Sequence, residues 1–295
     1  MSKGGVNKMF KEVIVAENAG FCFGVKRAVE TSTSANEDNN STIYTFGPLV
    51  HNKNVIDFLK EKGISHIDMP DLDRLGPEDT VIIRSHGVTP EVMKQIKSTG
   101  VQVTDATCPF VTAIHKRIKE YYDLGYQIII VGDENHPEVV GSNGWCNNTA
   151  IITKDGSNLD TKAKKICIVA QTTEKKANLD KVVEVISGLG GEVVTFNTIC
   201  SATKERQKSA EETSRIVDVM MVVGSRSSSN TTKLYEICSK NCENTIFIDN
   251  SSEIPKWIFE SENIKKVGLT AGASTPDWII QDVLDKLAAY TEGCR

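Results

Sequence analysis

The sequence has few aromatic residues and no long apolar run. Phe, Trp and Tyr together make up 6% of its 295 residues. Apolar stretches such as IIIVG near residue 130 are far shorter than the roughly 20 residues that a membrane-spanning helix needs. The first ten residues contain no apolar signal core. We therefore expect a chain that stays in the cytoplasm and does not enter a membrane.

The chain also lacks an excess of basic residues over acidic ones. The chain has 34 Lys and Arg residues against 39 Asp and Glu residues, which gives a formal net charge of −5. Nucleic-acid-binding proteins usually carry excess positive charge, so we expect no nucleic-acid partner. The Walker motif G-x-x-x-x-G-K-[ST] is absent as well. Any phosphate must therefore be bound by other hydrogen-bond donors.

Short apolar strands alternate with amphipathic helices along the whole chain, a pattern typical of α/β architecture with parallel sheets. Clear helical periodicity is present at 110–122, 177–186 and 276–289. Strands are expected at 12–16, 42–46, 80–84, 101–104, 126–131, 150–153, 166–170, 192–196, 217–223, 245–249 and 265–270.

Three cysteines, each between a strand and a helix, indicate a weak internal repeat. They are Cys22 in GFCFGVKRA, Cys108 in DATCPFVTA and Cys200 in NTICSATKE. Their spacing of roughly 90 residues matches one small α/β lobe per repeat. Only strand 12–17 precedes the first cysteine, so we expect it to complete the third lobe and close a pseudo-threefold ring. The predicted lobes span 18–107, 108–197 and 198–290.

Polar side chains follow two strands in each predicted lobe, at positions related by the repeat. Ligands of open α/β sheets bind beyond the carboxyl ends of the strands, so these side chains are expected to line a binding site. Histidines and hydroxyls suit an anion such as phosphate. The candidates are His51, His86, His136, Thr172, Ser228, Ser229, Asn230 and Ser274.

The same geometry would bring the three repeat cysteines to a common axis. A helix N-terminus favours the thiolate, which is the form that binds metal. Three thiolates without a fourth partner suggest either Zn²⁺ with an open position or a cubane iron–sulfur cluster with one free iron, and the spacing does not decide between them. Glu138, in HPEVVG, is the carboxylate best placed to handle protons beside such a metal.

The other cysteines and histidines are expected to be structural. Cys238 and Cys242 have a metal-like C-x₃-C spacing, but no second pair lies nearby, and Cys238 continues an apolar helical face. His66 and His115 lie on stretches that read as helical or connecting. The remaining cysteines in this group are Cys146, Cys167 and Cys294.

Eight motifs occur in order over essentially the whole chain: GFCFGV, VHN, SHGV, DATCP, HPEVVG, AQTT, GSRSSSN and TAGAS. In these motifs the chain resembles the LytB family of 4-hydroxy-3-methylbut-2-enyl diphosphate reductases. The resemblance implies three α/β lobes around an oxygen-sensitive [4Fe–4S] cluster on Cys22, Cys108 and Cys200, with one open iron. It also implies reductive removal of the allylic hydroxyl of the substrate. That reaction yields isopentenyl and dimethylallyl diphosphate in the last step of the non-mevalonate pathway.

The resemblance also implies roles for the polar candidates and for a partner. Glu138 would deliver protons, and Thr172 would hydrogen-bond near the substrate hydroxyl. A small ferredoxin or flavodoxin would supply electrons. The diphosphate would be held by His51, His86, His136, Ser228, Ser229, Asn230 and Ser274.

The chain departs from the family pattern in places. The run SATKERQ after Cys200 replaces a more usual Thr-Asn-Arg-Gln run, so no role is assigned to Thr203 or Lys204. Little sequence follows the last expected helix, and we expect the S1-type domains of some relatives to be missing. Two other functions fit the residues: a zinc hydrolase in which Glu138 activates water at a three-cysteine site, and a non-catalytic protein that binds a phosphorylated ligand.

Overall fold

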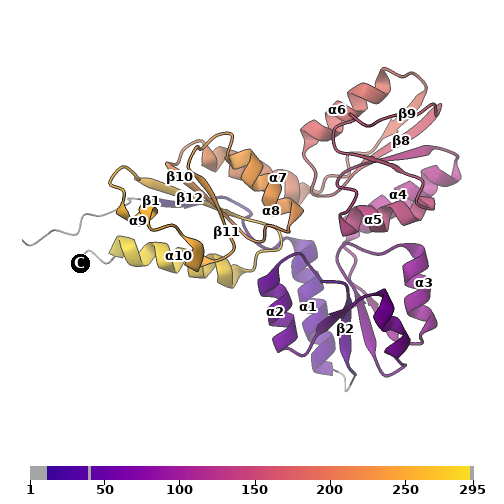
Figure 1. Ribbon diagram of the computed structural model, residues 1–295, viewed down its shortest axis with the longest axis horizontal. Coiled ribbons are helices and arrows are strands. Elements are labelled where there is room, and N and C mark those ends of the chain that lie inside the picture. Colours follow the sequence, from indigo (N-terminus) through magenta and orange to yellow (C-terminus); the bar gives the residue numbers. More distant parts are fainter. Residues whose placement is uncertain (1–11, 39–40, 293–295) are drawn as a thin grey trace, which may run out of the picture. The chain divides into compact units, whose positions relative to one another are not determined.

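The computed structural model describes residues 12–38 and 41–292 (Figure 1). Each of its three sheets has four strands, and every strand pair is parallel. The first sheet contains β2 (Ile43–Phe46), β3 (Ser65–Ile67), β4 (Thr80–Ile83) and β5 (Gln102–Asp105). The second contains β6 (Gln127–Val131), β7 (Ile151–Thr153), β8 (Lys165–Ala170) and β9 (Glu192–Thr195). The third contains β10 (Val219–Val223), β11 (Thr245–Ile248), β12 (Lys266–Ala271) and β1 (Glu12–Val15).

Helices lie in most of the connections between these strands, which is usual for parallel pairing; residues 154–164, between β7 and β8, contain none. Those around the first sheet are α1 (Phe23–Asp38), α2 (Lys53–Glu61), η1 (Met69–Arg74) and α3 (Pro90–Ser98). Next come α4 (Pro109–Asp123), α5 (Pro137–Asn143), η2 (Gly144–Cys146) and α6 (Lys176–Ser187). The last are α7 (Ser201–Ser214), α8 (Ser229–Cys238), η3 (Ser251–Glu253), α9 (Trp257–Glu260) and α10 (Asp277–Glu292). None of the described helices is long and apolar enough to cross a membrane.

The three sheets share one strand order. They read β3-β2-β4-β5, β7-β6-β8-β9 and β11-β10-β12-β1. In the third sheet the outer place of β5 and β9 is taken by β1, which pairs with β12 from Glu12↔Lys266 to Val15↔Leu269. The predicted α/β class and the predicted placement of the N-terminal strand are therefore confirmed.

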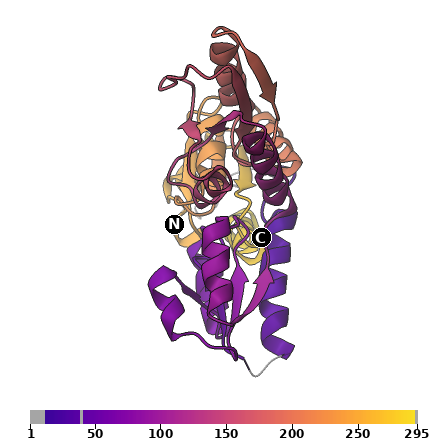
Figure 2. The same cartoon turned by 90° about the vertical axis from the view of Figure 1, so that its right-hand side faces the viewer.

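The burial of each strand follows its place in the sheet. The inner strands β4 (TVII) and β10 (VMMVV) are buried at every position, as expected for parallel strands covered on both faces. The three equivalent outer strands β1, β5 and β9 all have exposed ends and half-buried centres. Figure 2 shows the strands of the first sheet (purple) with helices on either side.

A glycine follows β2 in the first sheet and β6 in the second, where the chain approaches a neighbouring segment closely. A Cβ on Gly132, after β6, would lie 2.9 Å from the Cβ of Gln171, after β8. A Cβ on Gly47, after β2, would lie 2.4 Å from a guanidinium nitrogen of Arg84. The turns at the carboxyl edge of both sheets are thus tightly packed, and the candidate site residues lie in these turns.

By its contacts the chain divides into two compact units. Of the described residues, unit 1 contains 12–22, 51–55 and 201–292, and therefore the third sheet. Unit 2 contains residues 23–50 and 56–200, and therefore the first two sheets. The lobe boundaries expected from the repeat stay a prediction.

One detail differs from the sequence analysis. Strand β3 was missed, and His66 lies on it, exposed, rather than on a helical or connecting stretch. The connection from β11 to β12 carries η3 and α9. Cys294 lies outside the described residues.

Candidate functional site

The three repeat cysteines occupy equivalent places. Each follows an outer strand and lies directly before a helix: Cys22 before α1, Cys108 before α4 and Cys200 before α7. Each donates its backbone N–H to a carbonyl two residues after the third strand of its own sheet. The bonds are Cys22 to Ala273 (3.1 Å), Cys108 to Ser85 (3.0 Å) and Cys200 to Thr172 (3.2 Å). Three equivalent hydrogen bonds, one in each sheet, therefore fix the backbone of these cysteines.

Exposure separates these three cysteines from the others. Cys22, Cys108 and Cys200 are half-buried, whereas the other four described cysteines are buried. Burial raises the thiol pKa of Cys167 and of Cys238 to about 12, which keeps both thiols protonated. Cys238 and Cys242 pack in a core cluster with Ala210 and Leu234, not at a metal site.

Glu138 and Thr172 form a buried pair in unit 2. Glu138 lies in the first turn of α5 and is 3% exposed, and Thr172 follows β8. The Glu138 carboxylate accepts the backbone N–H of Thr172 at 2.6 Å and the Thr172 hydroxyl at 2.5 Å. Because the carbonyl of Thr172 also accepts the N–H of Cys200, the carboxylate is held directly beside one cysteine segment.

Two of the predicted histidines lie together. The rings of His86 and His136 meet edge to face with centroids 5.3 Å apart. His136 caps α5, and its Nδ1 accepts the N–H of Glu138 at 3.2 Å, so a neutral His136 ring carries its proton on Nε2. His51 lies in the turn between β2 and α2 and is half-buried.

The polar residues of the third sheet form a second group, in unit 1. Ser228 caps the ten-residue helix α8, and the Ser274 hydroxyl donates to the Ser228 hydroxyl at 3.4 Å. Asn230 Oδ1 accepts the N–H of Ala273 at 2.9 Å. Its Nδ2 is buried and has no hydrogen-bond partner within the described part of the chain. Ser229, the first residue of α8, is half-buried.

A buried donor without a hydrogen-bond partner destabilises the folded protein unless a bound ligand accepts its hydrogen bond. The amide of Asn230 lies beside two hydroxyls and the N-terminus of α8. This group therefore suits an anion with several acceptor oxygens.

Gln171 is a site residue that the sequence analysis missed, although its motif AQTT was quoted. It is 1% exposed and follows β8 directly. Its Oε1 accepts the N–H of Asp133 at 3.1 Å, and its Nε2 donates to the Thr173 hydroxyl at 2.9 Å. Gln171 thus joins the turn that leads to His136 with the turn that contains Thr172. Its position directly after a strand was the available signal.

A family model described as "LytB protein" matches residues 13–288. The chain belongs to the LytB family. It is 50% identical over 279 residues to a 4-hydroxy-3-methylbut-2-enyl diphosphate reductase of Clostridium perfringens, covering 95% of this chain and 99% of that protein. It is 51% identical over 280 residues to the reductase of the same name from Clostridium acetobutylicum. That alignment covers 94% of this chain but only 44% of the longer relative.

Two solved structures agree with this family assignment. One, titled as (E)-4-hydroxy-3-methyl-but-2-enyl diphosphate reductase, the terminal enzyme of the non-mevalonate pathway, has a TM-score of 0.70 at 38% identity. The match covers 95% of this chain and 99% of the solved one. The second, a reductase from Plasmodium falciparum, has a TM-score of 0.86 at 28% identity and covers 95% and 88%. The LytB resemblance and the three-sheet α/β fold are therefore confirmed, and the family is one of oxidoreductases.

Proposed function

We propose that the chain reduces 4-hydroxy-3-methylbut-2-enyl diphosphate to isopentenyl and dimethylallyl diphosphate. Two electrons and two protons enter, the allylic C–O bond breaks, and the hydroxyl leaves as water. The observation that carries the proposal is a buried carboxylate, Glu138, held by Thr172 directly beside the Cys200 segment. The group that would transfer protons, Glu138, then lies next to a cysteine segment that would bind the redox-active metal.

The cofactor in this proposal is one [4Fe–4S] cluster held by Cys22, Cys108 and Cys200, with one iron left open to substrate. The residues fit such a group for two reasons. Among the described cysteines only these three are partly exposed, and the backbone N–H of each makes an equivalent hydrogen bond within its own sheet. Thiolates are the ordinary ligands of iron–sulfur clusters. When bound, the cluster supplies electrons and a Lewis acid for the substrate hydroxyl.

Glu138 is the proposed proton donor. Its two hydrogen bonds from Thr172 fix the carboxylate in one orientation, which a proton transfer over hydrogen-bond distance requires. Thr172 in turn places a hydroxyl oxygen close to the substrate oxygen that leaves. Burial of both residues keeps bulk water from competing as a proton source.

The diphosphate is the proposed ligand of the strand-end polar residues. The unpartnered Nδ2 of Asn230, the hydroxyls of Ser228 and Ser274, and the Nε2–H of His136 all offer donors. Charge-assisted hydrogen bonds to phosphate oxygens are stronger than neutral ones, so a few such donors suffice. The remaining proposed contacts are His51, His86 and Ser229.

A separate electron donor is part of the proposal. The proposed enzyme uses no flavin of its own, so another redox protein must reduce its cluster. A small ferredoxin or flavodoxin has the required low potential. We also propose a cytoplasmic location, which is supported by the free thiols of all seven described cysteines.

Anaerobic purification followed by iron, zinc and sulfide analysis, a visible spectrum and a turnover assay tests the proposal. We expect a brown protein with about four irons per chain, which reduces the substrate when a low-potential reductant is supplied. A colourless zinc protein that hydrolyses the substrate would support the zinc hydrolase instead. Tight diphosphate binding without reduction, by protein that carries the cluster, would support a non-catalytic binding protein.

A further inference from the structure

Helix α7 carries a buried arginine to which neither the sequence analysis nor the proposed reaction gives a role. Arg206 is 2% exposed. One of its terminal nitrogens donates to the carbonyl of Gly20 at 2.8 Å, and the other donates to the carbonyl of Ala202 at 3.3 Å. Burying a guanidinium is costly unless its donors are bonded, so the contact with Gly20 is a specific interaction rather than incidental packing.

The segment that Arg206 binds is the one that presents Cys22. Gly20 lies two residues before Cys22, and its backbone N–H donates to Ala271 at 3.3 Å. Gly20 has a φ of +92°, and a Cβ there would lie 2.7 Å from the side chain of Ile280. Gly20 is therefore held by the end of β12 through its N–H and by Arg206 through its carbonyl.

Helix α7 binds this segment at a second point. Ser209 lies one turn after Arg206, on the same face of the helix. Its hydroxyl donates to the carbonyl of Glu17. Together, Arg206 and Ser209 fix both ends of the 17–20 backbone to α7. Both residues, and the segment they hold, belong to unit 1.

We propose that Arg206 is a positioning residue for Cys22, which holds the 17–22 segment so that the thiolate is already in place when the cluster binds. The inference rests on the proposed role of Cys22 as a cluster ligand. Because its guanidinium bonds to the carbonyl of Gly20, Arg206 also places a permanent positive charge beside the segment that carries that ligand. A nearby cation favours the reduced, more negative state of a cluster, so Arg206 also raises its reduction potential.

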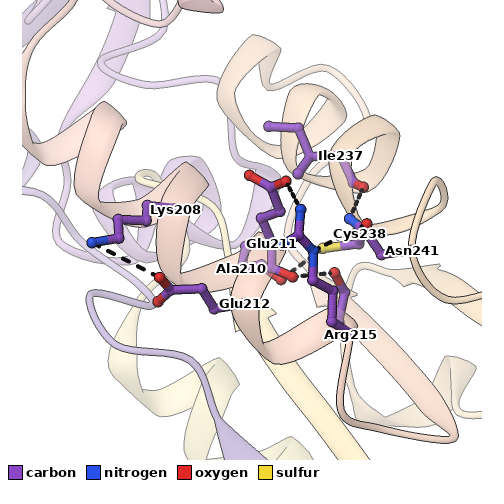
Figure 3. Close-up of polar contacts among 9 residues, drawn as sticks. Lys208, Ala210, Glu211, Glu212, Arg215, Ile237, Cys238 and Asn241 are labelled. Atoms are coloured by element: carbon purple, nitrogen blue, oxygen red, sulfur yellow. Dashed lines mark hydrogen bonds and ion pairs between the residues drawn. The ribbon is translucent and has the colours of Figure 1, made fainter.

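Arg206→Met and Arg206→Lys test this inference, and Arg215→Met is the matched control. Arg215 directly follows the last residue of the same helix and is exposed, where it pairs with Glu211 and contacts Asn241 (Figure 3). Hydrogen exchange of the 17–22 amides is measured in the cluster-free protein. Cluster content, stability against a chelator and the midpoint potential are measured in the loaded protein.

We expect Arg206→Met to speed exchange of the Gly20 and Cys22 amides at least about tenfold, the factor expected for loss of a hydrogen bond to a charged group. The cluster should be lost faster to the chelator, and its potential should become more negative. Arg206→Lys keeps the charge and should recover most of the potential but only part of the exchange protection. Arg215→Met should match the wild type in all four measurements.

Ser209→Ala keeps the inference testable if Arg206→Met does not fold. It leaves the charge in place, so it should speed exchange at 17–22 with little change in potential. A folded Arg206→Met with wild-type exchange and wild-type potential would overturn the inference. An iron-free wild-type protein would instead overturn the proposed function, so the two failures are distinguishable.

Discussion

Thr172 joins the buried carboxylate of Glu138 to the backbone of Cys200. It donates its N–H and its hydroxyl to the carboxylate at 2.6 and 2.5 Å, and its carbonyl accepts the N–H of Cys200 at 3.2 Å. A single residue after β8 thus sets the distance between a proton-carrying group and a cysteine segment. Proton delivery and metal binding should therefore be separable by substitutions at these positions.

Glu138→Gln is expected to separate them. Glutamine keeps the shape of the side chain and one acceptor for the N–H of Thr172, but it cannot supply a proton. We expect normal iron content, near-normal substrate binding and a kcat lowered at least about a hundredfold. Anaerobic steady-state kinetics with substrate titration would measure this. A near-wild-type kcat would move the proton donor elsewhere.

Asn230→Asp tests the diphosphate contact. Aspartate keeps the acceptor for the N–H of Ala273 but replaces the unpartnered Nδ2 donor with a negatively charged oxygen. Repulsion from the diphosphate should raise KM by about 30-fold or more, with a much smaller change in kcat. Asn241→Asp, at an exposed site beyond α8, is the control and should leave KM unchanged. Equal KM values for the two variants would contradict the assignment.

Cysteine substitutions test the cluster ligands. Cys22→Ser, Cys108→Ser and Cys200→Ser should each lower iron content sharply and remove nearly all activity. Cys238→Ser should leave iron content near the wild-type value, because that thiol is buried in the core beside Ala210 and Leu234. Iron analysis after anaerobic reconstitution gives the comparison. Loss of the cluster from the Cys238 variant, with the protein still folded, would make the ligand assignment wrong.

His115 makes the stability of the protein depend on pH. It lies on α4, is 4% exposed, and stacks on Trp145 with ring centroids 5.1 Å apart. Burial lowers its pKa from 6.5 to about 4, against the opposing effect of Asp105. Between these values the unfolded chain binds a proton that the folded protein does not, so stability is full above pH 6.5 and falls as pH falls towards 4.

This loss amounts to about 2 kcal/mol between pH 7.5 and pH 5. Denaturant unfolding of the cluster-free protein at the two pH values measures it. His115→Gln should reduce the difference by that amount. An unchanged pH dependence in the His115 variant would show that another group is responsible.

Repetition made most of this fold predictable. The three Cys-containing turns indicated three sheets. Because only strand 12–17 precedes Cys22, that strand was expected to complete the third sheet. Strand β3 was missed because Ser65, His66 and Ile67 are too few to show an alternating pattern. Local signals of this kind fail for short outer strands, whose position depends on the neighbouring strand.

The site was only partly predictable, for a related reason. His86 and His136 could be chosen because histidines are rare in this chain and follow strands. Arg206 could not be chosen, because α7 reads SATKERQKSAEETS and shows no apolar stripe that would mark a buried face. Nothing in that pattern marks Arg206 as a buried residue. Its role depends on Gly20, a partner 186 residues away along the chain.

The pairing of β1 with β12 has a consequence for synthesis on the ribosome. Strand β1 emerges long before its partner at 266–271. The first two sheets consist of consecutive segments and can therefore fold while the chain is still growing. The segment that ends in Cys22 must wait for β12. We expect cluster insertion to follow the synthesis of β12. Cys22, although translated before Cys108 and Cys200, should therefore be the last of the three to reach its final position.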